Sequence, residues 1–143
     1  MFARQRGIAS RLFDFARALV GPIRGGLAHA NVLASMIFAG MSGSAVADAG
    51  GLGMVEIKAM TDQGYRKEYA AAVTVSSSTI GPIIPPSIPM VIYGAMAEVS
   101  VGRLFLGGFL PGILMGILLM ITVAIISKRR GYPRERRAAE IDA

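Results

Sequence analysis

Hydroxyl side chains and prolines are concentrated in one stretch, which reads S-S-S-T-I-G-P-I-I-P-P-S-I-P-M-V-I-Y from Ser76 to Tyr93. Its four prolines are Pro82, Pro85, Pro86 and Pro89. Because proline lacks an N–H and also restricts the preceding residue, a regular helix cannot run through this stretch. We therefore expect two half-helices joined by an unwound segment, about Thr79 to Pro86. Unwound backbone presents free carbonyl groups, which several transporters use to bind ions.

A second interruption, G-M-S-G-S from Gly40 to Ser44, divides another uncharged stretch. If the two interruptions lie at similar depth, the oxygens of four residues form a site: Ser42, Ser44, Thr79 and Ser87. Oxygen ligands of this kind suit hard cations. The sequence therefore predicts an ion site. The alternative is that these hydroxyl groups only hydrogen-bond between helices.

Catalytic chemistry has little support. The chain has no cysteine and one histidine, His29, so thiolate chemistry and cysteine metal sites are excluded, and His29 is expected to be a packing residue. The Gly40–Ser44 motif has serine where a nucleophile elbow needs its last glycine. Glu56 occupies the place of the third glycine in a dinucleotide fingerprint. We predict that the chain is not an enzyme.

Two polar residues lie in or beside uncharged segments, Asn31 and Asp48. An ionisable group inside a membrane segment is costly and suggests a function. The alternative for Asp48 is a helix cap or a partner for a basic side chain near the surface, since Glu56 and Lys58 follow closely.

The charge pattern indicates a membrane protein. The mean hydropathy is +0.54, and the 17% of residues that are charged are gathered into blocks between long neutral runs. Tyr69–Ala97 is uncharged over 29 residues, and Leu104–Ser127 over 24. Each is long enough to cross a bilayer. Four glycines of the second run are expected to form a helix-packing face, and Pro111 is expected to kink it: Gly107, Gly108, Gly112 and Gly116.

Residues 1–26 contain five arginines, with apolar residues Ile8, Leu12, Phe15 and Leu19 at helical spacing. This pattern predicts an amphipathic helix at a membrane surface, and Ser10 is a candidate cap. The alternative is a surface helix that packs on a soluble core. No cleavable signal peptide is expected, because this region has no uninterrupted apolar core.

The basic residues discriminate between two topologies. If residues 27–60 form a re-entrant hairpin, 14 of the 15 basic residues share one side and only Arg103 lies opposite; a kinked crossing would divide them six against nine. The positive-inside rule favours the hairpin and makes the basic side cytoplasmic. The predicted order is a cytoplasmic connector (61–68), a broken transmembrane helix (69–97), a transmembrane helix (104–127) and a basic cytoplasmic tail (128–143). The arginine clusters thus follow from topology, and nucleic acid is not an expected partner.

Two long segments resemble the large permease (M) subunit, DctM, of TRAP (tripartite ATP-independent periplasmic) transporters. They are A-N-V-L-A-S-M-I-F-A-G-M-S-G-S-A-V-A-D-A (Ala30–Ala49) and S-S-T-I-G-P-I-I-P-P-S-I-P-M-V-I-Y-G (Ser77–Gly94). The resemblance implies an all-α membrane protein with part of one inverted repeat of an elevator-type secondary transporter. It also implies sodium-driven uptake of a carboxylate such as a C4-dicarboxylate, with no other cofactor. The implied partners are a small membrane subunit, a periplasmic substrate-binding protein and lipid, in the bacterial or archaeal cytoplasmic membrane.

The resemblance assigns roles to both interruptions. Sodium is expected at Ser42, Gly43, Ser44, Thr79, Gly81 and Pro82. Substrate is expected at Ser44, Pro86 and Ser87. Members of the family are longer and contain two inverted repeats, and the substrate site of such transporters lies between repeats. The chain is therefore expected to be partial, and the alternative function is a non-transporting fragment or assembly element of such a permease.

Overall fold

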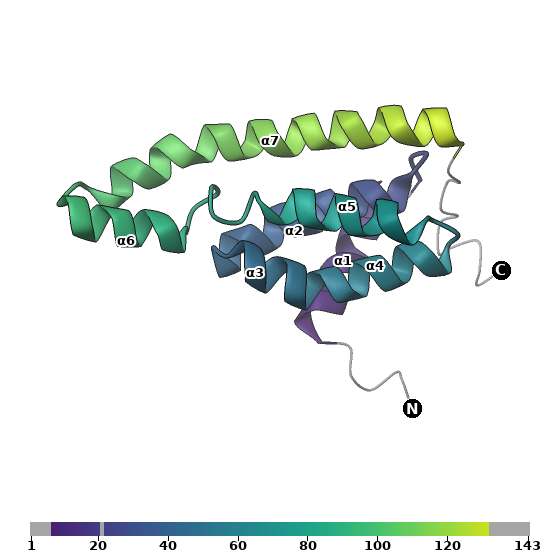
Figure 1. Ribbon diagram of the computed structural model, residues 1–143, viewed down its shortest axis with the longest axis horizontal. Coiled ribbons are helices and arrows are strands. Elements are labelled where there is room, and N and C mark those ends of the chain that lie inside the picture. The colour runs from purple at the N-terminus through teal and green to yellow at the C-terminus, as the bar shows by residue number, and fades with distance from the viewer. Residues whose placement is uncertain (1–6, 21, 132–143) are drawn as a thin grey trace.

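The computed structural model describes residues 7–20 and 22–131, and its regular elements there are helical (Figure 1). In chain order they are α1 (Ile8–Val20), α2 (Gly26–Ser42), α3 (Ala45–Ala47), the π-helical turn η2 (Asp48–Leu52), α4 (Gly53–Asp62), α5 (Lys67–Ser78), α6 (Ile88–Ala97) and α7 (Val101–Arg130). The expected all-α class is confirmed. α7 alone among the described helices has both the length and the apolar composition to cross a membrane.

A helical hairpin is formed by α2 and by the continuous run of α3, η2 and α4. Gly43 ends α2 in the left-handed conformation at φ 60°, and its N–H donates to the carbonyl of Ala39. Ser44 is extended, and its Oγ accepts from the N–H of Ala47, which starts the returning helix. The chain thus reverses over two residues, and α4 returns beside α2 (Figure 1). The interruption is shorter than predicted, because Gly40 stays in the helix.

The proline-rich stretch is unwound where the sequence predicted it. α5 ends at Ser78 and α6 begins at Ile88, so residues 79–87 connect two half-helices. Pro89 does not break α6, because it lies in the first turn, where a missing N–H has no cost. The connector before α5 is also shorter than predicted, since α4 runs to Asp62 and α5 begins at Lys67.

The glycines of α7 pack against the segments that precede it. A Cβ atom on Gly112 would overlap the side chain of Ile84, and one on Gly116 would overlap Met36 of α2. A Cβ on Gly108 would lie 2.6 Å from the carbonyl oxygen of Ile83. The prediction is wrong for Gly107, which has no neighbour within 4 Å. α7 continues through Pro111 and extends beyond the predicted span at both ends.

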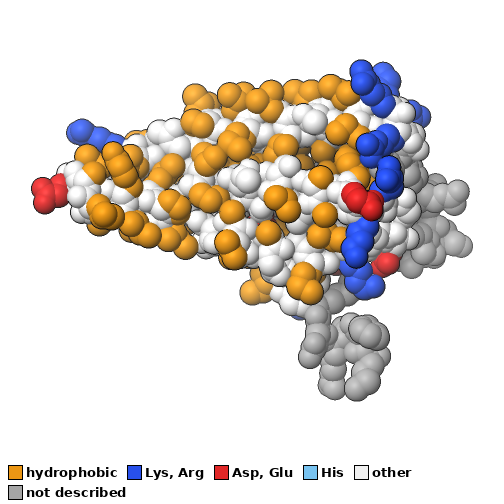
Figure 2. All heavy atoms as spheres, viewed as in Figure 1, with side chains coloured by type: hydrophobic (Ala, Val, Ile, Leu, Met, Phe, Trp, Pro, Cys, Tyr) orange, Lys and Arg blue, Asp and Glu red, His pale blue; other side chains and the backbone are white. Residues whose placement is uncertain are grey.

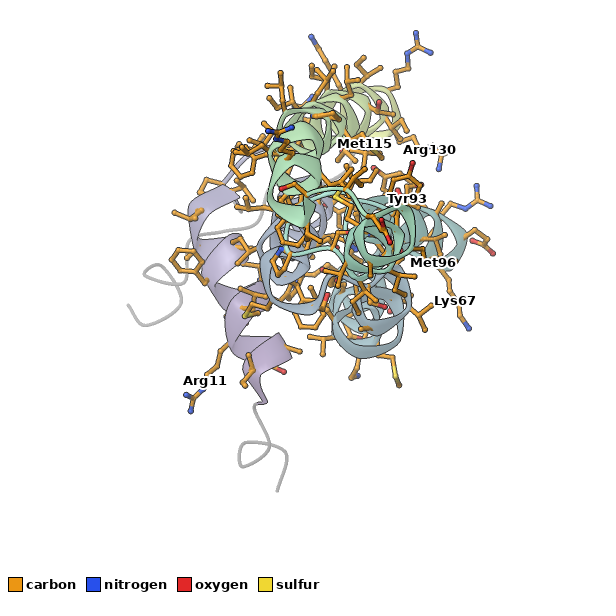
Figure 3. All side chains as sticks on the ribbon, turned by 90° about the vertical axis from the view of Figure 1, so that its left-hand side faces the viewer. Arg11, Lys67, Tyr93, Met96, Met115 and Arg130 are labelled. Carbon is orange, nitrogen blue, oxygen red and sulfur yellow. The ribbon has the colours of Figure 1, made fainter. Side chains whose placement is uncertain are left out.

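Helix α1 is shorter than predicted, and most of the apolar stripe that was predicted to lie at a membrane surface is exposed. It ends at Val20; residues 1–6 and 21 lie outside the described part of the chain. Phe13 and Ala16 are buried, whereas Ile8, Phe15 and Leu19, three of the four residues in the predicted apolar stripe, are exposed. Ser10 lies inside the helix, so it is not the cap. Figure 3 shows Arg11 pointing away from the other helices.

The core lies between α1, α2, α4 and α5, with α7 along one side (Figure 1). Figure 2 shows apolar side chains along the length of the visible face, with most of the visible Lys and Arg side chains gathered at one end. That end holds the α4–α5 connection and the end of α7 (Figure 1). The opposite end holds the α6–α7 turn, which begins at Glu98. Arg103 follows it in the first turn of α7. Both outer ends of the α2–α4 hairpin therefore face the basic end.

Candidate functional site

The two interruptions lie against each other. The N–H of Ile88 donates to the carbonyl of Gly43 at 3.4 Å, which joins the start of α6 to the hairpin tip. A Cβ on Gly43 would overlap the carbonyl oxygen of Pro86, and one on Gly81 would lie 3.1 Å from the carbonyl carbon of Ser44. Glycine at both positions therefore permits backbone to approach backbone. The junction joins four helix ends, those of α2, α3, α5 and α6.

The hydroxyl groups at this junction mostly bond within their own segments. Ser44 Oγ caps α3, and Ser87 Oγ caps α6 by accepting from the N–H of Met90 at 3.2 Å. Ser87 also donates its hydroxyl hydrogen to the carbonyl of Pro82, and Thr79 donates to the carbonyl of Ser76 at 2.6 Å. A hydroxyl that has donated its hydrogen keeps acceptor lone pairs. Thr79 and Ser87 can therefore still offer oxygen to a cation.

The predicted site residues fall into two groups. Gly43, Ser44, Gly81 and Pro86 are brought together across the junction. Ser42 and Thr79 instead bond within their own segments: Ser42 Oγ lies 3.4 Å from the N of Ser44. Gly43, Gly81 and Ser87 are buried, whereas Thr79 and Pro86 are exposed.

Opposite dipole ends meet at this junction. α3 and α6 begin there, so their first N–H groups favour negative charge, while the last carbonyls of α2 and α5 favour positive charge. Broken helices that place both kinds of terminus at one point can hold an anionic group and a coupling cation together. The arrangement is compatible with binding an anionic group and a cation at the same junction.

A buried polar cluster lies between α2 and α5. Asn31 Nδ2 donates to Thr74 Oγ1 at 2.8 Å, and Ser77 Oγ donates to Asn31 Oδ1 at 2.9 Å. Ser35 Oγ lies 3.0 Å from Ser77 Oγ. Asn31, predicted as a polar intramembrane residue, is thus part of an interhelical network. Its partners were missed, although Asn31 and Ser35 at i, i+4 and Thr74 and Ser77 at i, i+3 carried the signal.

Asp48 is buried one turn behind the hairpin tip, with 2% of its surface exposed. Its N–H donates to the carbonyl of Ser44, and its side-chain Oδ1 is buried without a hydrogen-bond partner among the described residues. The nearby Lys58 forms its ion pair with Asp62, at 3.5 Å, and not with the buried Asp48. His29, also buried, has Nδ1 3.1 Å from the carbonyl oxygen of Gly25, which fits a packing role.

Comparison with known proteins gives a consistent result. The DctM component of tripartite ATP-independent periplasmic transporters matches residues 1–143. The chain is 53% identical over 126 residues to the sialic acid TRAP transporter large permease protein SiaM of Vibrio cholerae, covering 88% of this chain and 30% of the relative. It is 52% identical over 132 residues to the sialic acid TRAP transporter permease protein SiaT of Haemophilus influenzae, covering 92% and 21%.

A third relative is named for a different substrate. The chain is 44% identical over 138 residues to the C4-dicarboxylate TRAP transporter large permease protein DctM of Pseudomonas aeruginosa, covering 96% of this chain and 32% of the relative. The chain therefore spans between about a fifth and a third of the length of these three relatives.

Proposed function

Because the chain belongs to the DctM family of tripartite ATP-independent periplasmic transporter components, we propose that it forms part of a sodium-driven permease for a carboxylate. Its relatives are transporter permeases, which fits a protein that is not an enzyme. Sialic acid and C4-dicarboxylates, the substrates in their names, both carry carboxylate groups. The observation that carries the proposal is the contact between the hairpin tip at Gly43 and the unwound segment at Pro86 and Ile88.

At this junction we assign sodium to the hydroxyl and carbonyl oxygens of Ser42, Gly43, Ser44, Thr79, Gly81 and Pro82. A carboxylate binds at Ser44, Pro86 and Ser87, beside the first N–H groups of α3 and α6. Support comes from the caps: Ser44 and Ser87 each start a helix, so the positive ends of two helix dipoles lie near the same point. The carbonyl ends of α2 and α5 supply the negative ends for the cation.

The proposed setting is the cytoplasmic membrane of a bacterium or archaeon, with several passes and lipid around the outer face. The partners are a small membrane subunit and a periplasmic substrate-binding protein. In this setting α2 and α4 form a re-entrant hairpin and the basic end is cytoplasmic. Support comes from the end-to-end separation of charge, with the outer ends of the hairpin at the basic end (Figure 2).

Cysteine labelling tests the topology, because the chain has no cysteine of its own. Asp62→Cys lies at the end of α4 and Ser100→Cys lies in the α6–α7 turn. Intact cells that carry either variant are treated from outside with a membrane-impermeant thiol reagent. We expect labelling at position 100 and none at position 62. Labelling at position 62 but not at 100 would refute the re-entrant hairpin.

Sodium-specific stabilisation tests the ion site in the reconstituted chain. Sodium chloride should raise the thermal midpoint above that in equal potassium chloride, because only the folded junction binds sodium. Ser44→Ala and Thr79→Ala should remove this difference. Thr122→Ala is the matched control, since Thr122 also donates to a carbonyl of its own helix but lies on α7. Equal midpoints in both salts, or a difference that survives Ser44→Ala and Thr79→Ala, would contradict the assignment.

A further inference from the structure

Glu56 of α4 is the most deeply buried acidic residue among those described. None of its surface is exposed, and neither Oε1 nor Oε2 has a hydrogen-bond partner. α4 packs against α1, α2, α5 and η2, so the carboxyl group is enclosed by helices. Its position is separate from the proposed ion site, since Glu56 lies in α4, beyond α3 and the η2 turn that follow the hairpin tip at Ser44.

The charged groups of the surrounding helices do not neutralise Glu56. Asp48 on η2 acts on Glu56 through its charge, and this interaction is repulsive when both groups are ionised. On α1 the charged residues are Arg11, Asp14 and Arg17; on α5 they are Lys67 and Glu68; α2 contributes His29 and α4 also carries Lys58 and Asp62. Lys58 pairs with Asp62, and His29 is directed to Gly25. No hydrogen bond from these described residues reaches Glu56.

A further chain segment or subunit cannot give the Glu56 carboxyl group a charged or hydrogen-bonding partner unless the helices around Glu56 move. Surface side chains can gain partners from further chain segments or subunits, but a fully enclosed carboxyl group offers no surface to a new side chain. α1, α2 or α5 would have to move first. Of the species that can neutralise a carboxylate, a proton needs no space and no additional ligands. An ionised carboxylate in an apolar interior is strongly unfavourable, and such a group neutralises instead.

We propose that Glu56 is a proton-binding site, whose carboxyl group keeps its proton in the folded chain at neutral pH. The proton is lost to water when α4 separates from the helices around it, and the carboxylate remains on Glu56. The returning arm of the hairpin thus carries a neutral side chain while it is packed. A movement that opens this arm to water would release one proton.

Infrared spectroscopy tests the protonation state directly. The reconstituted chain at neutral pH should show the carbonyl band of a protonated carboxylic acid, and Glu56→Gln should lose it. Glu68→Gln, at an exposed position on α5, is the matched control and should keep the band. Asp48→Asn should keep it too. A band that is absent from the unsubstituted chain, or that survives Glu56→Gln, would overturn the proposal.

A second measurement remains decisive if Glu56→Gln does not fold. Labelling all glutamate carboxyl groups with ¹³C in the unsubstituted chain should shift the band, because exposed glutamates are ionised and contribute none. An unshifted band would assign the proton to an aspartate and refute the proposal. Repeating the spectrum in sodium and potassium chloride distinguishes the occupant. A band that appears only without sodium would show that sodium, and not a proton, neutralises Glu56.

The same proton determines how stability depends on pH. The folded state holds one proton more than the unfolded state at pH values where an exposed glutamate is ionised. Raising the pH therefore favours unfolding, and the unfolding equilibrium constant should rise up to tenfold per pH unit between about pH 5 and pH 8. Glu56→Gln should remove that part of the slope and Glu68→Gln should not. This result does not depend on sodium binding at the junction, so the two proposals can fail separately.

Discussion

Helices α2 and α7 are both apolar, but α2 is largely buried whereas α7 is largely exposed. α2 buries residues on all sides, including His29, Asn31 and Ser35, because α1, α4, α5 and α7 surround it. α7 is longer but buries a single line of mostly small residues, namely Gly108, Gly112, Gly116, Val123 and Ser127. Similar hydropathy therefore marks a core element in one case and a helix with an exposed apolar surface in the other.

The two helices differ in where their large side chains point and in which polar partners they have. Polar side chains of α2 have hydrogen-bond partners on α5, so they can be buried without leaving their polar atoms unpaired. The outward side of α7 carries large apolar residues, among them Leu106, Phe109, Leu110, Leu114 and Leu118, which suit hydrocarbon. Its inner side is nearly free of side chains, so α7 lies close to the loop at Ile83 and Ile84.

Leucine truncation should give the largest contrast between the two helices. Leu27 on α2 is 2% exposed, and Leu110 on α7 is 74% exposed. Leu27→Ala should lower the free energy of unfolding by about 2–3 kcal/mol, because it leaves a cavity. Leu110→Ala should cost under about 0.5 kcal/mol. Unfolding of the micelle-bound chain measures both, and equal losses would contradict the assignment of α7 to the exterior.

Adding a methyl group to neighbouring glycines of α7 should separate its two faces. Gly108→Ala places Cβ 2.6 Å from the carbonyl oxygen of Ile83, which is backbone and cannot turn aside. We expect a loss of about 1–3 kcal/mol in the free energy of unfolding. Gly107→Ala meets no atom within 4 Å and should be neutral or stabilising by up to about 1 kcal/mol. The reverse order would show that α7 packs through its other face.

Replacing one threonine in the buried cluster and one on α7 by valine should give the smallest difference in stability. Thr74 Oγ1 accepts from Asn31 Nδ2 in the buried cluster, whereas Thr122 on α7 is exposed and bonds a carbonyl of its own helix. Thr74→Val should cost about 1 kcal/mol, because the amide hydrogen loses its oxygen acceptor. Thr122→Val should change stability by less than about 0.5 kcal/mol. If Asn31→Leu in the Thr74→Val background costs as much as it does alone, the two residues are not coupled.

Several predictions from sequence concerned the chain near one residue, and these agree with the structure. The prolines placed the unwound segment at residues 79–87 to within a residue, because proline acts on its own backbone and its neighbour's. The predicted break at Gly40–Ser44 contains the turn that the structure forms at Gly43 and Ser44. The extent of the turn was overestimated, because Gly40 has helical neighbours on both sides.

Predictions that needed knowledge of a neighbouring helix were less accurate. The stripe of Ile8, Phe15 and Leu19 was predicted to lie at a membrane surface and is exposed, but the sequence did not predict that α1 contacts the other helices through Phe13 and Ala16. Both sets are compatible with helical periodicity, so the position of α2 decides. Gly107 was grouped with Gly108, although only a particular rotation of α7 brings one of them against Ile83.

From the sequence alone we could predict the helical class, the segregation of charge, the family and the positions of both helix interruptions. These follow from composition, from long ordered motifs and from dihedral restrictions that act between adjacent residues. The three-dimensional packing was needed to establish that Gly43 lies against Pro86, that Asn31 bonds Thr74 and that Glu56 is enclosed. Those facts depend on distances between segments far apart in the chain, which the packing of whole helices sets and no local pattern records.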